Sequence, residues 1–186
     1  MSCVICLACN SFAFIASDGR AINAETGEII DENYKKIRRI NKDVIVGFVG
    51  TADVCEGALM ALPSNSENLT LTEIAEILCL NAKRLHIETG LKGSMILAGV
   101  ENNRIVVCSF GRLNGYTIER TEHTSDGATL EGLYPDNINS NIFAECFDEC
   151  SDKGFSYLLK ETFHRVSSLS DTVNENISFL TVSIPS

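Results

Sequence analysis

The first fifty residues alternate short apolar runs with brief polar interruptions, a pattern typical of paired strands. The apolar runs Val4 to Cys9 and Phe12 to Ser17 flank Asn10-Ser11, and together they predict a tight hairpin. Counting outward from this two-residue turn pairs Ser2 with Gly19. The residues on either side of Gly19 should therefore lie beside the amino terminus.

A second pair of runs, Lys35 to Ile40 and Val44 to Val49, predicts another hairpin. The same counting sets Lys36 opposite Phe48, so Lys36 and Gly50 share the open end of this hairpin. The second run has no polar alternation, as expected of a strand that is covered on both faces.

Helical and strand patterns alternate in blocks along the rest of the chain. Helices are predicted over four segments: about Ala52 to Leu62, Leu71 to Glu88, Asn141 to Cys150 and Phe155 to Ser168. Strands are predicted over four others: Ser94 to Val100, Arg104 to Phe110, near Tyr116 to Glu119, and Ile177 to Ile184. This order favours an α+β fold, a four-layer αββα sandwich of two antiparallel sheets flanked by helices.

Composition agrees with one domain over residues 1–186, because 45% of the residues are apolar and supply a sizeable core. The formal net charge of −10 argues against nucleic acid and anionic membranes as partners, since both require a positive face.

Eight cysteines without a secretory signal predict a reducing compartment, and we expect the cytoplasm. Cys3, Cys6 and Cys9 form a C-x-x-C-x-x-C pattern that invites a metal interpretation. In an extended strand, residues three apart point to opposite faces, so these sulfurs cannot converge on one ion. We expect neither a metal nor a cofactor.

Ser2 follows Met1 directly, and a small second residue permits removal of the methionine. The new terminus would carry a hydroxyl and a free α-amine on one residue. An α-amine titrates near ~8, so it can accept the hydroxyl proton directly or through one water. Ser2 could thus be both nucleophile and base.

Three segments carry a resemblance to a known family. Residues 33–39 (NYKKIRR) and 46–53 (VGFVGTAD) resemble the bacterial HslV peptidase, and residues 17–21 (SDGRA) are similar to proteasome β subunits. The resemblance is specific over roughly the first 60 residues and implies an N-terminal nucleophile hydrolase, whose fold is the αββα sandwich.

Carried over by position, the resemblance implies that Ser2 is the nucleophile, Asp18 the acidic residue, Lys36 the lysine and Gly50 the oxyanion-hole glycine. A charged lysine near the amine disfavours protonation of that amine, and a glycine presents its N–H to an oxyanion without a blocking side chain. Arg20 is expected to support the site rather than react.

The supporting residues of the family lie further along the chain. Asp171 matches the family's second aspartate, whereas Asp126 falls where a serine is usual and Ser125 stands one position away. Asn174 replaces a second serine. A carboxylate from Asp126 near the α-amine would raise the pKa of that amine, which opposes its use as a base.

The favoured function is therefore a peptidase subunit that cleaves peptide bonds through Ser2. The resemblance also implies self-association into rings, an unfolding ATPase as partner and unfolded polypeptide as substrate. Two alternatives stay open: a catalytically silent assembly subunit of the same fold, and an amidase that acts on small amides.

Overall fold

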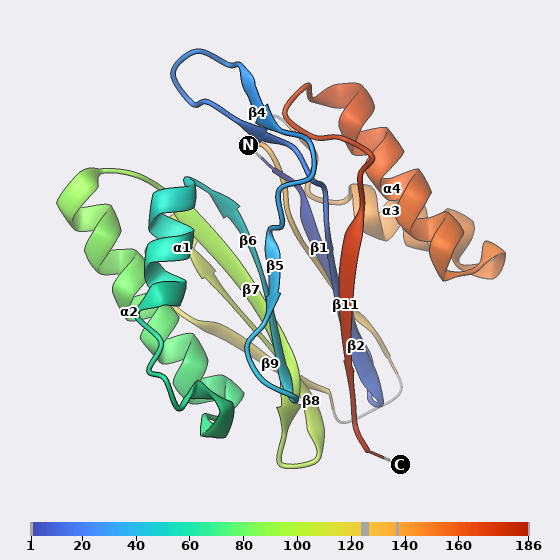
Figure 1. The fold of residues 1–186 in the computed structure, drawn as a ribbon. Helices are drawn as coiled ribbons and strands as arrows, with labels where there is room; N and C mark the ends of the chain where they lie inside the picture. The colour runs from blue at the N-terminus through green and yellow to red at the C-terminus, as the bar shows by residue number, and fades with distance from the viewer. Residues whose placement is uncertain (1, 124–126, 137, 186) are drawn as a thin grey trace.

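Two stacked antiparallel sheets form the centre of the molecule in this computed structural model, which describes residues 2–123, 127–136 and 138–185, without the side chain of residue 151 (Figure 1). The first sheet has the strand order β10-β1-β2-β11. Its strands are β1 (Val4–Ala8), β2 (Phe12–Ser17), β10 (Thr129–Leu133) and β11 (Ser178–Ser183). Val4 pairs with Ser17, which is the register that the two-residue turn predicts.

The second sheet has the order β5-β6-β7-β8-β9. Its strands are β5 (Ile37–Arg39), β6 (Val44–Gly50), β7 (Gly93–Glu101), β8 (Arg104–Gly111) and β9 (Glu119–His123). The N–H of Phe48 donates to the carbonyl of Lys36 at 3.0 Å, so the predicted pairing of these two residues is confirmed. Lys36 consequently lies at the open end of the β5–β6 hairpin.

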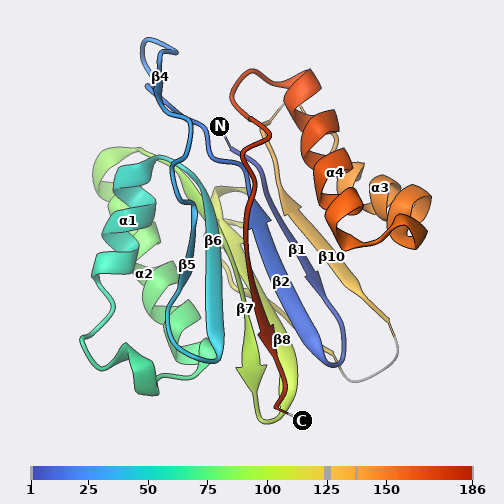
Figure 2. The same ribbon diagram turned by 45° about the vertical axis from the view of Figure 1, so that its right-hand side comes forward.

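Helices cover both outer faces of the sheets (Figures 1 and 2). Helices α1 (Ala52–Met60) and α2 (Leu71–Thr89) lie on the five-stranded sheet, whereas α3 (Ile142–Cys150) and α4 (Phe155–Leu169) lie on the four-stranded sheet. The predicted αββα sandwich is confirmed.

Short elements complete the connections. They are a ribbon of β3 (Ala21–Ile22) and β4 (Ile29–Asp31) and the 3-10 turns η1 (Ser66–Asn68), η2 (Arg112–Asn114) and η3 (Ser151–Lys153). The β3–β4 ribbon projects beyond the sheets at the end of the molecule where the amino terminus lies (Figure 1).

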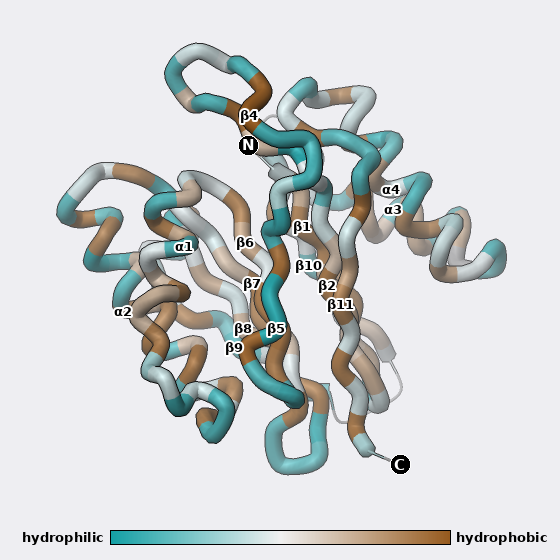
Figure 3. The backbone as a smooth tube through the Cα atoms, in the orientation of Figure 1, coloured by the Kyte–Doolittle hydropathy of each residue, from teal (hydrophilic) through white to brown (hydrophobic). Residues whose placement is uncertain are grey.

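Three apolar layers hold the sandwich together: one between the sheets and one under each helical pair. Figure 3 shows hydrophobic stretches of the chain along the central strands as brown segments. Alternation along β1 sends Cys3 and Ile5 toward α3 and α4, and Val4 and Cys6 toward the other sheet. Cys3 and Cys6 therefore belong to different layers, as the strand argument predicts.

Gly47 marks the close approach of the sheets. A Cβ at this position would lie 2.7 Å from side-chain atoms of both Ile15 and Val4. The absence of a side chain lets β6 cross directly over β1 and β2.

Three strand predictions were wrong or incomplete. Strand β9 begins at Glu119 rather than near Tyr116, because η2 and a left-handed Tyr116 (φ 58°) occupy the earlier segment. Strand β10 was not predicted, since Glu131 and Gly132 weaken its strand pattern. The β3–β4 ribbon was not predicted because the side chains of β4 are exposed.

Among the described residues, no helix combines the length and the apolar character needed to cross a membrane.

Candidate active site

Asp18 is the centre of a buried polar cluster directly after β2. Its side chain has no exposed surface, and its Oδ1 accepts a hydrogen bond from the N–H of Cys3 at 2.8 Å. Its Oδ2 accepts from the N–H of Arg20 at 2.9 Å and from Lys36 Nζ at 2.7 Å. These donors satisfy the carboxylate and offset the cost of removing it from water.

Lys36 reaches this carboxylate from the start of the second hairpin. Its side chain is 3% exposed, and Nζ also donates to the carbonyl of Arg20 at 2.6 Å. Burial lowers the pKa of the Lys36 ammonium, while the neighbouring Asp18 carboxylate opposes that shift. The net direction is downward, and a cation with a lowered pKa is frequent in catalytic sites.

The register of β1 and β2 brings the residue that follows Ser2 to this ion pair. The N–H of Asp18 donates to the carbonyl of Cys3 at 3.2 Å, and Cys3 donates back to the Asp18 carboxylate. Ser2 precedes Cys3 and is 9% exposed. The ammonium of Lys36 is therefore joined, through one carboxylate, to the backbone of the residue that follows Ser2.

Gly50 ends β6 at the same end of the sandwich. Its φ of 110° is in the region that favours glycine, and a Cβ would lie 2.4 Å from the carbonyl oxygen of Lys92. The N–H of Thr51 donates to that same carbonyl at 2.8 Å. The turn from β6 into α1 thus requires glycine for two reasons, the positive φ and the lack of space for a Cβ.

Arg20 ties the site to two neighbouring segments. Its guanidinium makes two hydrogen bonds of 3.0 Å to the carboxylate of Glu32, and Nη1 donates to the backbone carbonyl of Asp171 at 2.6 Å. These contacts connect Arg20 to the segments before β5 and before β11, and its supporting role stays a prediction. Because the Glu32 carboxylate receives these bonds, its pKa is lowered.

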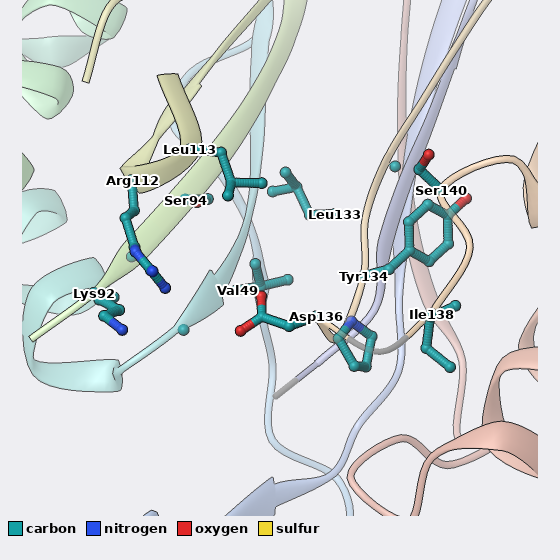
Figure 4. A pocket seen from close by; sticks show the side chains of 14 residues that line it. Val49, Lys92, Ser94, Arg112, Leu113, Leu133, Tyr134, Asp136, Ile138 and Ser140 are labelled. Atoms are coloured by element: carbon teal, nitrogen blue, oxygen red, sulfur yellow. The ribbon is translucent and has the colours of Figure 1, made fainter. Parts of the chain in front are cut away.

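A cavity of about 400 Å³ adjoins Gly50 (Figure 4). One wall includes Gly50 and Gly93 at the ends of β6 and β7, and the other includes Tyr134 and Asp136 after β10. Its volume is within the usual range for sites that bind small molecules or side chains.

Solved structures with a similar arrangement of elements include two proteasome-like proteins, an HslV and an Anbu. The eukaryotic HslV from Trypanosoma brucei matches with a TM-score of 0.67 and 16% sequence identity, over 97% of this chain and 99% of that one. The Anbu Gly-1 mutant from Hyphomicrobium sp. strain MC1 matches with a TM-score of 0.72 and 13% identity, over 98% of this chain and 82% of that one.

The chain has the HslV-type fold. The resemblance inferred from the first 60 residues is thereby confirmed at the level of the fold. No protein-family model matches the sequence, and neither does any curated protein. At identities of 16% and 13%, the shared fold does not by itself establish a shared reaction.

Within the HslV-type fold, the two C-terminal supporting residues lie in different environments. The Asp171 carboxylate is exposed and bonds no other described residue; the contact with Arg20 uses its backbone carbonyl. Asn174 is buried instead, where its Oδ1 accepts from the N–H of Gly19 at 2.9 Å and its Nδ2 donates to the carbonyl of Glu32. Asn174 therefore fixes the turn that carries Asp18.

Ser125 and Asp126 lie outside the described residues. The register of β10 shows which end of this strand lies toward Ser2. Thr129 pairs with Ala8 at the far end of β1, whereas Leu133 pairs with Val4. The chain after Leu133 therefore runs toward the amino terminus.

Two residues of that segment were missed by the sequence analysis. Tyr134 lies close enough to Cys3 for the two groups to interact. The pKa of Tyr134 is raised, mainly by burial and to a smaller extent by Cys3. Asp136 lines the cavity beside Gly50. The sequence carries only a weak signal for them, because Glu131 and Gly132 interrupt the strand pattern of β10, which positions the residues that follow it.

All eight cysteines are free thiols. Within the described ranges 2–123, 127–136 and 138–185, no three or more His, Cys, Asp or Glu side chains are grouped to hold a metal ion. Burial raises the pKa of Cys3, most strongly by desolvation and then through Asp18. A thiol in this environment stays protonated and is a poor nucleophile.

Proposed function

We propose that this protein is an N-terminal nucleophile peptidase in which removal of Met1 frees the amine of Ser2. The observation that carries the proposal is the buried Asp18–Lys36 ion pair, whose carboxylate also binds the N–H of Cys3, next to Ser2. A buried lysine with a lowered pKa is frequent in catalytic sites, and beside a free terminus its charge can tune the amine and the hydroxyl that react.

In the proposed reaction, the Ser2 hydroxyl attacks the carbonyl carbon of the scissile peptide bond while the Ser2 amine accepts the hydroxyl proton. The N–H of Gly50 stabilises the oxyanion that forms. The ammonium then returns the proton to the departing amine, which leaves an ester on Ser2. Water, deprotonated by the same amine, hydrolyses the ester and regenerates the enzyme.

Lys36 and Asp18 prepare the nucleophile in this scheme. The positive charge of Lys36 disfavours protonation of the Ser2 amine and favours ionisation of the hydroxyl. Asp18 compensates that charge and fixes Lys36 by a bond of 2.7 Å. Arg20 and Asn174 hold the Asp18 turn in place through Glu32 and Gly19.

The proposal extends to the setting in which such peptidases work. Likeness to the HslV structure supports self-association into rings, unfolded polypeptide as substrate and an unfolding ATPase as partner. Eight free thiols support a reducing compartment, and we place the protein in the cytoplasm.

Replacement of the nucleophile tests the reaction. Ser2→Ala should abolish cleavage of fluorogenic peptides, while Ser11→Ala, in the turn at the other end of the same hairpin, should retain the turnover of the parent protein. Intact mass spectrometry of both proteins should show loss of Met1. Full turnover in Ser2→Ala would overturn the mechanism.

Retention of Met1 together with absence of turnover would favour the silent assembly subunit. Cleavage of small amides without cleavage of peptides would favour the amidase.

A further inference from the structure

The cavity beside Gly50 has an apolar lining with charged groups at two edges (Figure 4). Its apolar contacts come from both sheets and from the segments that follow them: Val49, Leu113, Leu133, Tyr134 and Ile138. The remainder of the lining includes Lys92, Arg112 and Asp136. A cavity of about 400 Å³ with this composition accommodates one large side chain.

The charged groups of the cavity come from two opposite walls. In Figure 4, Lys92 and Arg112 extend from the β7 and η2 side, and Asp136 comes from the opposite wall. Among the described residues, no carboxylate forms an ion pair with either cation. Both cations are therefore available to a ligand.

The net positive character of this cavity runs against the composition of the chain. The whole protein has 15 Lys and Arg against 25 Asp and Glu, yet the cavity has two cations and one carboxylate. A local excess of cations in an acidic protein attracts an anionic group and repels a cationic one.

The position of the cavity relates it to the proposed reaction, on which this inference rests. Gly50 lines the cavity, and in that reaction the N–H of Gly50 receives the carbonyl oxygen of the scissile bond. When the carbonyl oxygen of the scissile bond lies at Gly50, the substrate residue adjoining that bond lies at the cavity. The lining of the cavity then contributes to specificity.

We propose that this cavity binds a carboxylate of the substrate next to the scissile bond, through Arg112 and Lys92. The carboxylate belongs to an acidic side chain or to the C-terminus of a short peptide, and the two share the same chemistry. The aliphatic part of the residue packs on Val49 and Leu133. Asp136, which reaches into the cavity from the opposite wall, repels a carboxylate and so weakens the preference that the two cations create.

The test uses internally quenched peptides that differ at one position, with Glu, its neutral isostere Gln, or Lys on either side of the scissile bond. The Glu peptide should have a kcat/KM roughly three- to fivefold above the Gln peptide, the range expected for an exposed charge pair. Peptides that end in a free acid or an amide directly after the scissile residue distinguish a terminal carboxylate from a side chain.

Variants of the cavity should shift the preference in opposite directions. Arg112→Gln should remove most of the preference for Glu over Gln, whereas Asp136→Asn should increase it. Arg84→Gln, on the exposed face of α2, is the matched control and should leave the preference unchanged. The preference should also fall as ionic strength rises, which a merely structural effect of Arg112 would not produce.

A binding measurement separates this inference from the proposed function. Titration calorimetry of Ser2→Ala with the Glu and Gln peptides should give the tighter Kd for Glu, whether or not the parent protein cleaves either. Turnover with equal kcat/KM for Glu and Gln peptides of every kind would overturn the carboxylate site and leave the peptidase intact. Tighter binding of Glu without turnover would retain the site and overturn the peptidase.

Discussion

The buried charges of Asp18 and Lys36 lie where the first two hairpins meet, and each compensates the other. Asp18 has no exposed surface and Lys36 has 3%, so either group alone would be an uncompensated charge in the interior. The turn lengths predicted that Asp18 lies beside the amino terminus and Lys36 at the open end of the second hairpin, and the family resemblance predicted that the two share one site. The electrostatic consequence, a lowered pKa for Lys36, depends on burial, which the sequence does not reveal.

The titration of Lys36 is therefore a direct check at the residue scale. Side-chain NMR of labelled lysine should give Lys36 a pKa below the ordinary value of 10.5. Since the folded state then releases this proton at lower pH than the unfolded state, the Lys36 contribution to the free energy of unfolding should increase with pH between those two values. A Lys36 pKa at or above 10.5 would contradict the desolvation argument.

Gly50 supplies a second residue-scale prediction. Gly50→Ala would force a side chain into the left-handed region and against the carbonyl of Lys92, so it should lower the free energy of unfolding by about 1–3 kcal/mol. It should also reduce peptide turnover, because the turn that aims the N–H must shift.

Gly127→Ala is the matched control, since a Cβ at Gly127 meets no atom of the described residues within 4 Å. Its denaturation midpoint should stay near that of the parent protein. Equal stability of Gly50→Ala and the parent protein would show that the turn relaxes freely.

At the scale of elements, strands flanked by short turns were predictable and strands with polar or exposed sequences were not. The two N-terminal hairpins have the registers expected from their turns, because an apolar strand that is buried on one face cannot slip by one residue. Strand β10 pairs with β1 across more than a hundred residues of sequence, and no local turn signals that pairing. Ser125 and Asp126 lie outside the described residues, so their match to the family stays a prediction.

Helix α2 begins with a capping box whose residue types are recognisable in the sequence. Thr70 Oγ1 accepts from the N–H of Glu73 at 3.2 Å, and the Glu73 carboxylate accepts from the N–H of Thr70 at 2.8 Å. Thr70→Ala should lower the free energy of unfolding by about 1 kcal/mol in chemical denaturation, with unchanged turnover. A loss of turnover at constant stability would contradict this prediction and would show that α2 affects the site.

At the scale of the whole molecule, the sandwich places the ends of separate elements at one edge. Asp18 follows β2, Lys36 precedes β5, and Gly50 ends β6, while Asn174 precedes β11. Element order was enough to predict the αββα layers. It was not enough to predict that Asn174 would be buried against the Asp18 turn while the Asp171 carboxylate stayed exposed, since that depends on how one loop packs.

Assembly is the prediction that belongs to this scale. Light scattering after size exclusion should give a solution mass that is a multiple of the 20.3 kDa chain, as a closed ring requires. The value should be independent of concentration over the accessible range. A mass of one chain at all concentrations would contradict the ring proposal without affecting the mechanism at Ser2.

The central claim is that one residue supplies both the hydroxyl and the amine. A peptidyl epoxyketone closes a six-membered morpholine ring only with an amine and a hydroxyl on adjacent carbons of one terminal residue. Mass spectrometry of the treated protein should therefore find a chain without Met1 that carries this adduct on Ser2, and no adduct on Ser2→Ala. A chain that keeps Met1 and stays unmodified would contradict the account.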